Sequence, residues 1–405
     1  MKYLADTEEL IRDGILSEPQ AAEIARRSRE AMIALAINIV LFCGLLAVIA
    51  GMAAYLDDAA QLTLLGAAVT LAGGIALLLA GEAYRLLANA TAVIGAAMLV
   101  GGGAFWLVQA RGTPDAAAVL GVPVALLGYL CWRVGPSRLR FLTGWLCFLG
   151  VAVHLAGLLA QPALIAPQWL VYHYAGVALV LCGLALDIRL ITALSMLAFA
   201  AALSSRSFYA TGAYAVAIYE CTLTILQMGV LGGLCLWAMR RCPDRRARHA
   251  EILGRLAFIW LNMAFWIGSI WGDTVGATLW GPRWARFSEI PYWQADAALQ
   301  AEFRTAREAF VASALHIPET VYAIAWAVLL AGTVIWAAMG ARRALFNTAV
   351  TFGAIHLYTQ YFERIDTTPG SIVIAGLIAI ALAYATWRLN AHLKARAGEG
   401  ARARG

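Results

Sequence analysis

The sequence is poor in charged residues, and this shortage sets its class. Asp, Glu, Lys and Arg make up 13% of the 405 residues, whereas soluble globular proteins contain roughly 25%. Hydrophobic residues make up 62%, and the mean hydropathy is +0.74. These values exclude an ordinary soluble domain and predict an all-α integral membrane protein.

The excess of positive charge does not indicate nucleic-acid binding. The net charge is +6, but the basic residues cluster in short loops and in the C-terminal tail. Such clusters determine the orientation of spanning helices and contact lipid headgroups. We therefore expect membrane lipids, and no nucleic acid, among the partners.

Motifs that carry catalysis or bind metals are missing. The seven cysteines contain no Cys-x-x-Cys pair and lie mostly in apolar runs, where they pack like small apolar residues. There is no His-x-x-x-His or His-Glu-x-x-His motif, no phosphate-binding Gly-rich loop and no nucleophile elbow. We expect no metal and no cofactor, and the sequence favours a protein that is not an enzyme without excluding one.

A cleavable signal peptide is also missing. The first 31 residues are rich in charge, and the apolar run that follows is long enough to span a membrane. We expect the first spanning helix itself to target the chain.

Twelve apolar runs are long enough to cross a bilayer, which takes about 20 residues for a helix. If the N-terminus is cytoplasmic, most Lys and Arg residues fall on the cytoplasmic side, so we predict that both termini are cytoplasmic. The predicted spans are 32–55, 60–81, 88–110, 115–133, 140–160, 168–187, 189–206, 213–239, 253–271, 319–340, 343–363 and 370–389.

The spans divide the chain into five predicted parts. These are a cytoplasmic helical hairpin (1–31), spans one to nine (32–271), a long outer loop with an amphipathic helix (272–318), spans ten to twelve (319–390) and a basic disordered tail (391–405).

The hairpin is predicted from local signals. Gly14 can end a first short helix, and Ser17 with Gln20 forms a capping box that begins a second. The hairpin is too small to fold alone, so it would either cap the cytoplasmic face of the bundle or dock a cytoplasmic partner protein.

The outer loop contains Leu299, Phe303, Ala306 and Phe310 at helical spacing, which predicts an amphipathic helix along the outer surface. Aromatic residues gather around it. They are explained by the preference of Trp and Tyr for the membrane interface, or by stacking on a sugar or lipid headgroup. The candidate contact residues are Trp280, Trp284 and Trp293.

The span 346–363 is unusually polar. Its inner part carries Asn347 and Thr351, and its outer part carries His356, Gln360 and Glu363. Such groups are costly in hydrocarbon, so this helix should lie inside the bundle.

Ionisable residues of four spans are predicted at a common depth. By helix rise, His154, His173, Glu220 and His356 each lie about 8–10 Å from the outer end of their spans. Together with Gln360 and Glu363 they predict an outward-opening polar cavity that binds a solute or a proton. The alternative is that each histidine is hydrogen-bonded to a neighbouring helix.

Two segments resemble a bacterial family of polytopic membrane proteins catalogued as domain of unknown function 2157. The first is Leu10-Ile11-Arg12-Asp13-Gly14-Ile15-Leu16-Ser17-Glu18-Pro19-Gln20-Ala21, and the second is Asn347 with Tyr361-Phe362-Glu363. The resemblance implies a multi-pass protein of the bacterial inner membrane. It implies no activity and no catalytic residue.

Three functions stay open at this point. A small-solute or proton-coupled transporter fits the span count and the polar layer. A scaffold or sensor fits the N-terminal hairpin. An enzyme acting on lipid or lipid-linked sugar fits the aromatic outer loop.

Overall fold

The computed structural model describes residues 7–364 except for short gaps at 13, 56–57, 80–84, 162–166, 204, 211–212, 289 and 341, and it describes isolated positions between 370 and 388. Most of the predicted last span (370–389) and the whole tail (391–405) lie outside these residues, as does the side chain of Glu363. The chain forms two compact units, Met1–Ala163 and Leu164–Gly405.

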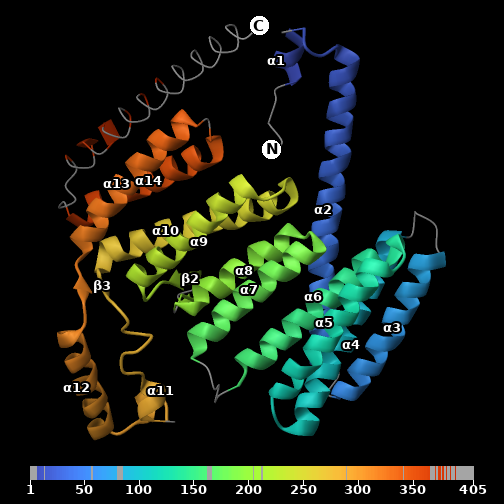
Figure 1. Ribbon diagram of the computed structural model, residues 1–405, viewed down its shortest axis with the longest axis horizontal. Helices are drawn as coiled ribbons and strands as arrows, with labels where there is room; N and C mark the ends of the chain where they lie inside the picture. The colour runs from blue at the N-terminus through green and yellow to red at the C-terminus, as the bar shows by residue number, and fades with distance from the viewer. Residues whose placement is uncertain are drawn as a thin grey trace. The chain divides into compact units, whose positions relative to one another are not determined.

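The first unit consists of helices (Figure 1). Within it, α3 packs against α4 and α5 packs against α6 at very short range. A Cβ atom added at Gly66 or Gly121 would overlap the backbone of Leu99 or His154, so these helices need glycine where they touch. The elements are α1 (Thr7–Arg12), α2 (Glu18–Tyr55), α3 (Ala59–Leu79), α4 (Arg85–Arg111), α5 (Asp115–Val134), a 3-10 turn (Ser137–Leu139) and α6 (Arg140–Leu159).

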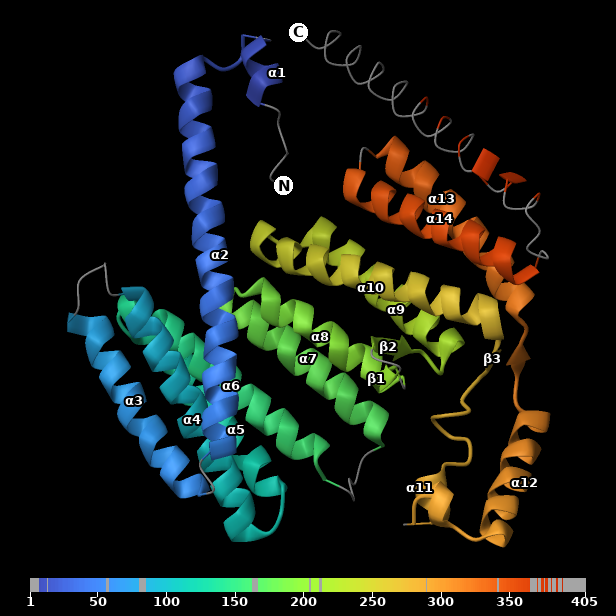
Figure 2. The same cartoon turned by 180° about the vertical axis from the view of Figure 1, so that it is seen from behind.

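The second unit is arranged around α10, which contacts α7, α8, α9, α13 and α14. Figure 2 shows α9 and α10 side by side, next to α13 and α14. Its elements are α7 (Gln168–Leu186), α8 (Arg189–Ala202), β1 (Arg206–Ala210), β2 (Ala213–Ala217), α9 (Cys221–Arg241), α10 (Asp244–Trp271), β3 (Asp273–Thr274), α11 (Trp284–Phe287), a 3-10 turn (Tyr292–Gln294), α12 (Ala297–Ser313), β4 (His316–Ile317), α13 (Glu319–Met339) and α14 (Arg343–Arg364).

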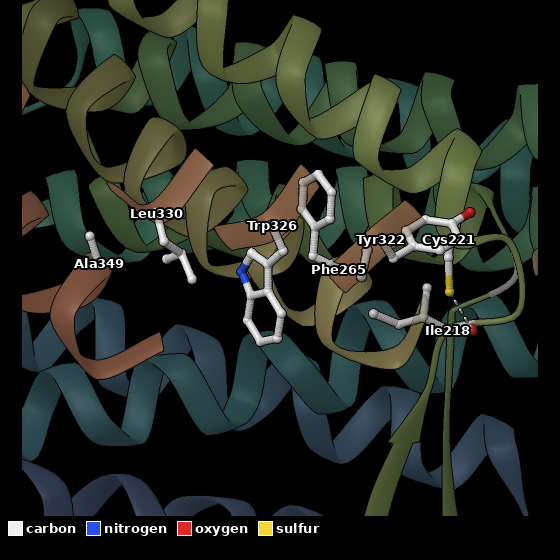
Figure 3. Close-up of a cluster of buried hydrophobic side chains, with 8 residues drawn as sticks. Ile218, Cys221, Phe265, Tyr322, Trp326, Leu330 and Ala349 are labelled. Atoms are coloured by element: carbon white, nitrogen blue, oxygen red, sulfur yellow. Dashed lines mark hydrogen bonds between the residues drawn. The ribbon is translucent and has the colours of Figure 1, made fainter. Parts of the chain in front are cut away.

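The core of the second unit lies where α9, α10, α13 and α14 meet. Trp326 is fully buried there, with Leu330 on one side of it along the cluster and Phe265 and Tyr322 on the other (Figure 3). Cys221, at the start of α9, donates its thiol proton to the carbonyl of Ile218. This core holds the elements that form the candidate site.

The N-terminal hairpin has the predicted local features. Gly14 has a positive φ of 68° at the end of α1, and the backbone N–H of Ser17 donates to Gln20 Oε1 at 3.0 Å. The second helix does not stop at the membrane, because α2 runs unbroken for 38 residues, about 57 Å. The hairpin is therefore continuous with the first predicted span, and its docking role stays a prediction.

Eight of the described helices are long and apolar enough to cross a membrane, judged by length and composition. This gives the chain the character of a predominantly helical, membrane-embedded protein. The eight are α3, α4, α5, α6 with its preceding 3-10 turn, α7, α9, α10 and α13.

The region of the predicted seventh and eighth spans differs from expectation. Helix α8 has 14 residues, about 21 Å, which is shorter than the roughly 30 Å hydrocarbon core. An antiparallel hairpin of β1 and β2 follows, with Ala210 paired to Ala213, and α9 begins only at Cys221. Aromatic and β-branched residues on both sides of Thr211-Gly212 favour this hairpin over a helix.

The outer loop contains the predicted amphipathic helix as α12, with Asp296 as its N-cap. The loop begins and ends in one short ribbon, because β3 pairs with β4. The two ends of the loop therefore lie together, at the C-terminal end of α10 and the N-terminal end of α13.

Candidate functional site

A cleft of about 530 Å³ lies between the C-terminal halves of α10 and α14. Its walls are apolar and aromatic, with hydroxyl groups from Tyr358 and Thr359. The Thr359 hydroxyl accepts a hydrogen bond of 2.9 Å from Trp266 Nε1, and Tyr358 is largely exposed. The volume falls in the range of small-molecule sites. The lining residues are Trp266, Ile270, Ala354, Ile355, Tyr358, Thr359 and Phe362.

Buried polar residues lie close to the cleft along its helices: Asn262 is one turn before Trp266 on α10, and His356 lies between Ile355 and Tyr358 on α14. Trp326 Nε1 donates to Asn262 Oδ1 at 2.9 Å, and Asn262 Nδ2 donates to the Phe258 carbonyl at 2.7 Å. The His356 ring meets the Trp326 ring edge to face, with centroids 4.7 Å apart. Asn262 and Trp326 are fully buried. The sequence analysis singled out His356 and missed Asn262, although both residues contact Trp326.

Gln360 and Tyr361 lie on the same stretch of α14 as the cleft. The atoms Gln360 Nε2 and Tyr361 Oη are buried and have no hydrogen-bond partner among the described residues. Buried polar atoms without partners are uncommon and costly. They offer a donor and a hydroxyl to a ligand or to a further part of the chain.

Glu220 anchors the outer loop. Its fully buried carboxylate accepts hydrogen bonds from Gly276 N at 2.7 Å, Thr278 N at 2.6 Å and Thr278 Oγ1 at 2.7 Å. These donors belong to a tight turn at residues 274–281, in which the Trp280 ring covers Gly276. The carboxylate therefore positions Trp280, a role that depth along a helix could not reveal.

A second buried carboxylate, Asp273, accepts hydrogen bonds at the N-terminal end of α9. Its Oδ2 accepts from Thr222 N at 2.8 Å and from Thr222 Oγ1 at 2.6 Å, and the Tyr322 hydroxyl is 2.5 Å from Thr222 Oγ1. An acidic group at a helix N-terminus satisfies free N–H groups and favours the helix dipole. Asp273 thus joins α9, α10 and α13 at the base of the outer loop.

The other two predicted histidines have structural partners. His173 Nδ1 is 2.8 Å from the Trp169 carbonyl and His173 Nε2 is 3.0 Å from Gln227 Nε2. His154 belongs to the first unit, where its Nδ1 is 2.8 Å from the Ala118 carbonyl. Each of these histidines therefore contacts a neighbouring helix, as the alternative interpretation proposed.

The aromatic residues of the outer loop divide into two groups. Trp284 packs edge to face on Phe303 and Tyr292, and its Nε1 donates to the Ile290 carbonyl at 2.6 Å. Trp284 therefore holds α11 against α12. Trp280 and Trp293 are exposed and can contact a membrane interface.

Asp187 and His249 form a further polar network that the sequence analysis did not identify. The predicted ninth span begins at residue 253, whereas α10 begins at Asp244 and so carries His249 into the bundle. His249 Nε2 is 3.0 Å from Asp187 Oδ1. The hydrogen bond with His249, together with the charge of Arg245, holds the pKa of the Asp187 carboxyl below its usual range.

This lowered pKa predicts acid sensitivity. A carboxyl whose pKa is lower in the folded than in the unfolded state stabilises the fold above its unfolded pKa, and the effect is lost as the pH falls through the folded pKa. Asp187→Asn should therefore lower the unfolding temperature at pH 7, and its difference from the wild type should shrink as the pH falls below about 3.9, the unfolded pKa of Asp. Thermal unfolding between pH 3 and 7 tests this, and a difference that is the same at both ends would contradict it.

No family model, no curated protein and no protein of known structure matches this chain. The resemblance to the 2157 family therefore stays a prediction, and function has to be argued from the geometry alone.

Proposed function

We propose that this protein is a multi-pass membrane carrier that binds a small solute with an apolar part in the cleft between α10 and α14. The main support is that the two helices lining the apolar cleft, α10 and α14, also carry the buried Asn262 and His356, which both contact Trp326 of α13. Convergent apolar walls with a few placed polar groups are typical of small-molecule sites.

Polar residues of α14 define how such a solute would be oriented. Thr359 and Tyr358 belong to the cleft lining and carry hydroxyl groups. A solute with one acceptor group and an apolar body would fit this distribution. The lining favours such a solute over an ion, because it contains no charged side chain.

The orientation follows from the positive-inside rule. We propose twelve spans with both termini in the cytoplasm of a bacterial inner membrane, with the cleft near the outer ends of α10 and α14. In this orientation the exposed Trp280 and Trp293 lie on the outer side of the membrane. The cleft then opens toward the outer face, where the sequence analysis expected a site.

Filling the cleft should abolish binding. A thermal-shift screen of the purified protein with ions, small solutes and lipids identifies a ligand, because a molecule that binds the folded state stabilises it. For that ligand, Ala354→Trp should weaken binding at least about tenfold, or roughly 1.4 kcal/mol, since the indole would occupy the cleft. Calorimetric titration measures the change.

The matched control is Ala325→Trp, which adds the same ring to an exposed alanine of α13 outside the cleft lining. Ala325→Trp should bind like the wild type. Equal binding by Ala354→Trp and the wild type would remove the cleft as the site. Failure of every compound to stabilise the wild type would argue against a carrier.

A further inference from the structure

Four side chains from three helices form a hydrogen-bonded network near the N-terminal end of α10. His249 is almost fully buried. Its Nε2 is 3.0 Å from Asp187 Oδ1, at the end of α7, and its Nδ1 is 2.7 Å from Thr192 Oγ1 in α8. Arg245 Nε lies 3.3 Å from Asp187 Oδ2. Both nitrogens of the imidazole are therefore engaged by side chains from other helices.

The backbone at Asp187 is adapted to this contact. Asp187 has a φ of 58°, in the left-handed region that usually holds glycine at the end of a helix. A residue with a side chain costs about 1–2 kcal/mol there, although Asp tolerates it better than most. A glycine at position 187 would adopt this backbone conformation without strain but would lack the carboxylate. Aspartate at this position accepts the strain and provides the partner of His249.

The network is complete in two protonation states. With a neutral imidazole, Nε2–H donates to Asp187 and Nδ1 accepts from the Thr192 hydroxyl. With a charged imidazole, both N–H groups donate, and the Thr192 hydroxyl oxygen accepts from Nδ1–H. Because a hydroxyl both donates and accepts, a proton can enter without leaving a buried group unpaired.

The charges around the imidazole come from all the packed helices. Asp187 places a negative charge in contact with it, and Arg245 opposes that charge while also donating to the Leu184 and Ala185 carbonyls. The other basic groups at this end are exposed, and Glu251 pairs with Arg255. The exposed groups are Arg189 on α8, Arg240 and Arg241 on α9, and Arg246 and Arg248 on α10.

We propose that Asp187, His249 and Thr192 form a proton-binding site that holds the α7–α8 turn against the N-terminal part of α10 and changes its charge with pH. In the proposed orientation this site lies near the cytoplasmic face. It does not depend on the cleft, and its test involves no ligand of the cleft.

The test compares thermal unfolding of the full-length protein at pH 5.5 and pH 8. The advantage of the wild type over His249→Gln should be larger at pH 5.5 by at least about 2 °C, because the charged imidazole gains the attraction of Asp187. Thr192→Ser keeps the hydroxyl and should follow the wild type. Thr192→Val cannot accept from Nδ1–H and should lose the pH dependence.

The control variant is His316→Gln, an exposed histidine on β4, whose curve should run parallel to that of the wild type. A constant difference between the wild type and His249→Gln would overturn the proposal, as would wild-type pH dependence in Thr192→Val. If His249→Gln does not fold, ¹⁵N-histidine spectra of the wild type and Thr192→Ser replace it. If the resonances of His249 show a change of charge state with pH in both proteins, the site is supported. If they do not, the proposal is overturned.

Discussion

Replacing Trp326 with alanine is expected to lower the free energy of unfolding by about 3–5 kcal/mol, the range for truncating a buried Trp or Phe. Trp326 is fully buried at the centre of the second unit. The change leaves a cavity and removes the donor to Asn262 Oδ1. Hydrogen bonds between membrane helices average only about 0.6 kcal/mol, so the cavity dominates.

Two variants separate packing from hydrogen bonding at this position. Trp326→Phe keeps an aromatic ring and loses the N–H group, so it should cost clearly less than the alanine variant. Trp237→Ala removes the same side chain from an exposed position on α9 and should cost little. Reversible denaturation of the full chain measures all three. Equal losses at positions 326 and 237 would contradict the central role of this core.

Replacing Glu220 with glutamine is expected to release the turn at residues 274–281. One amide oxygen can still accept from Thr278, but the amide NH₂ group then faces the Gly276 N–H, so two donors meet. Loss of charge-assisted hydrogen bonds of this kind costs about 2–4 kcal/mol locally. Amide hydrogen exchange at Gly276 and Thr278 should accelerate roughly 30- to 1,000-fold.

The control for this variant is Glu251→Gln, which removes the same charge from a surface ion pair on α10. It should leave exchange in the 274–281 turn unchanged. Unchanged exchange in Glu220→Gln would show that the carboxylate does not anchor the loop. It would return Glu220 to the role predicted from the sequence, a proton-binding group in a cavity.

The helical spans that the sequence predicted well are those with a long apolar run and clear ends. Helix α7 spans Gln168–Leu186 against a prediction of 168–187, and α13 spans Glu319–Met339 against 319–340. Composition and helix length alone determine such segments. The prediction failed at the start of the eighth span, where residues 213–217 form β2 instead of a helix. Apolar residues of this kind fit both a helix and a hairpin, and hydropathy does not distinguish the two.

The candidate site was predicted in part. His356 does lie in a buried polar layer, because polar residues on an apolar helix must face protein. Its neighbours Asn262 and Trp326 come from helices 30 or more residues away, and no pattern within the sequence pairs them. The same holds for Glu220, whose donors are backbone N–H groups that a sequence does not display.

The sequence by itself determined the class of this protein, the position of most of its helices and the capping of its N-terminal hairpin, because apolar length, charge and short-range hydrogen bonds act locally along the chain. Only the tertiary structure decided what each buried polar group contacts. Depth along a helix placed Glu220 and His356 in one layer. Packing instead pairs Glu220 with the turn at residues 274–281 and His356 with Trp326 of the core. The pairing of Asp187 at the end of α7 with His249 of α10 likewise depends on packing alone.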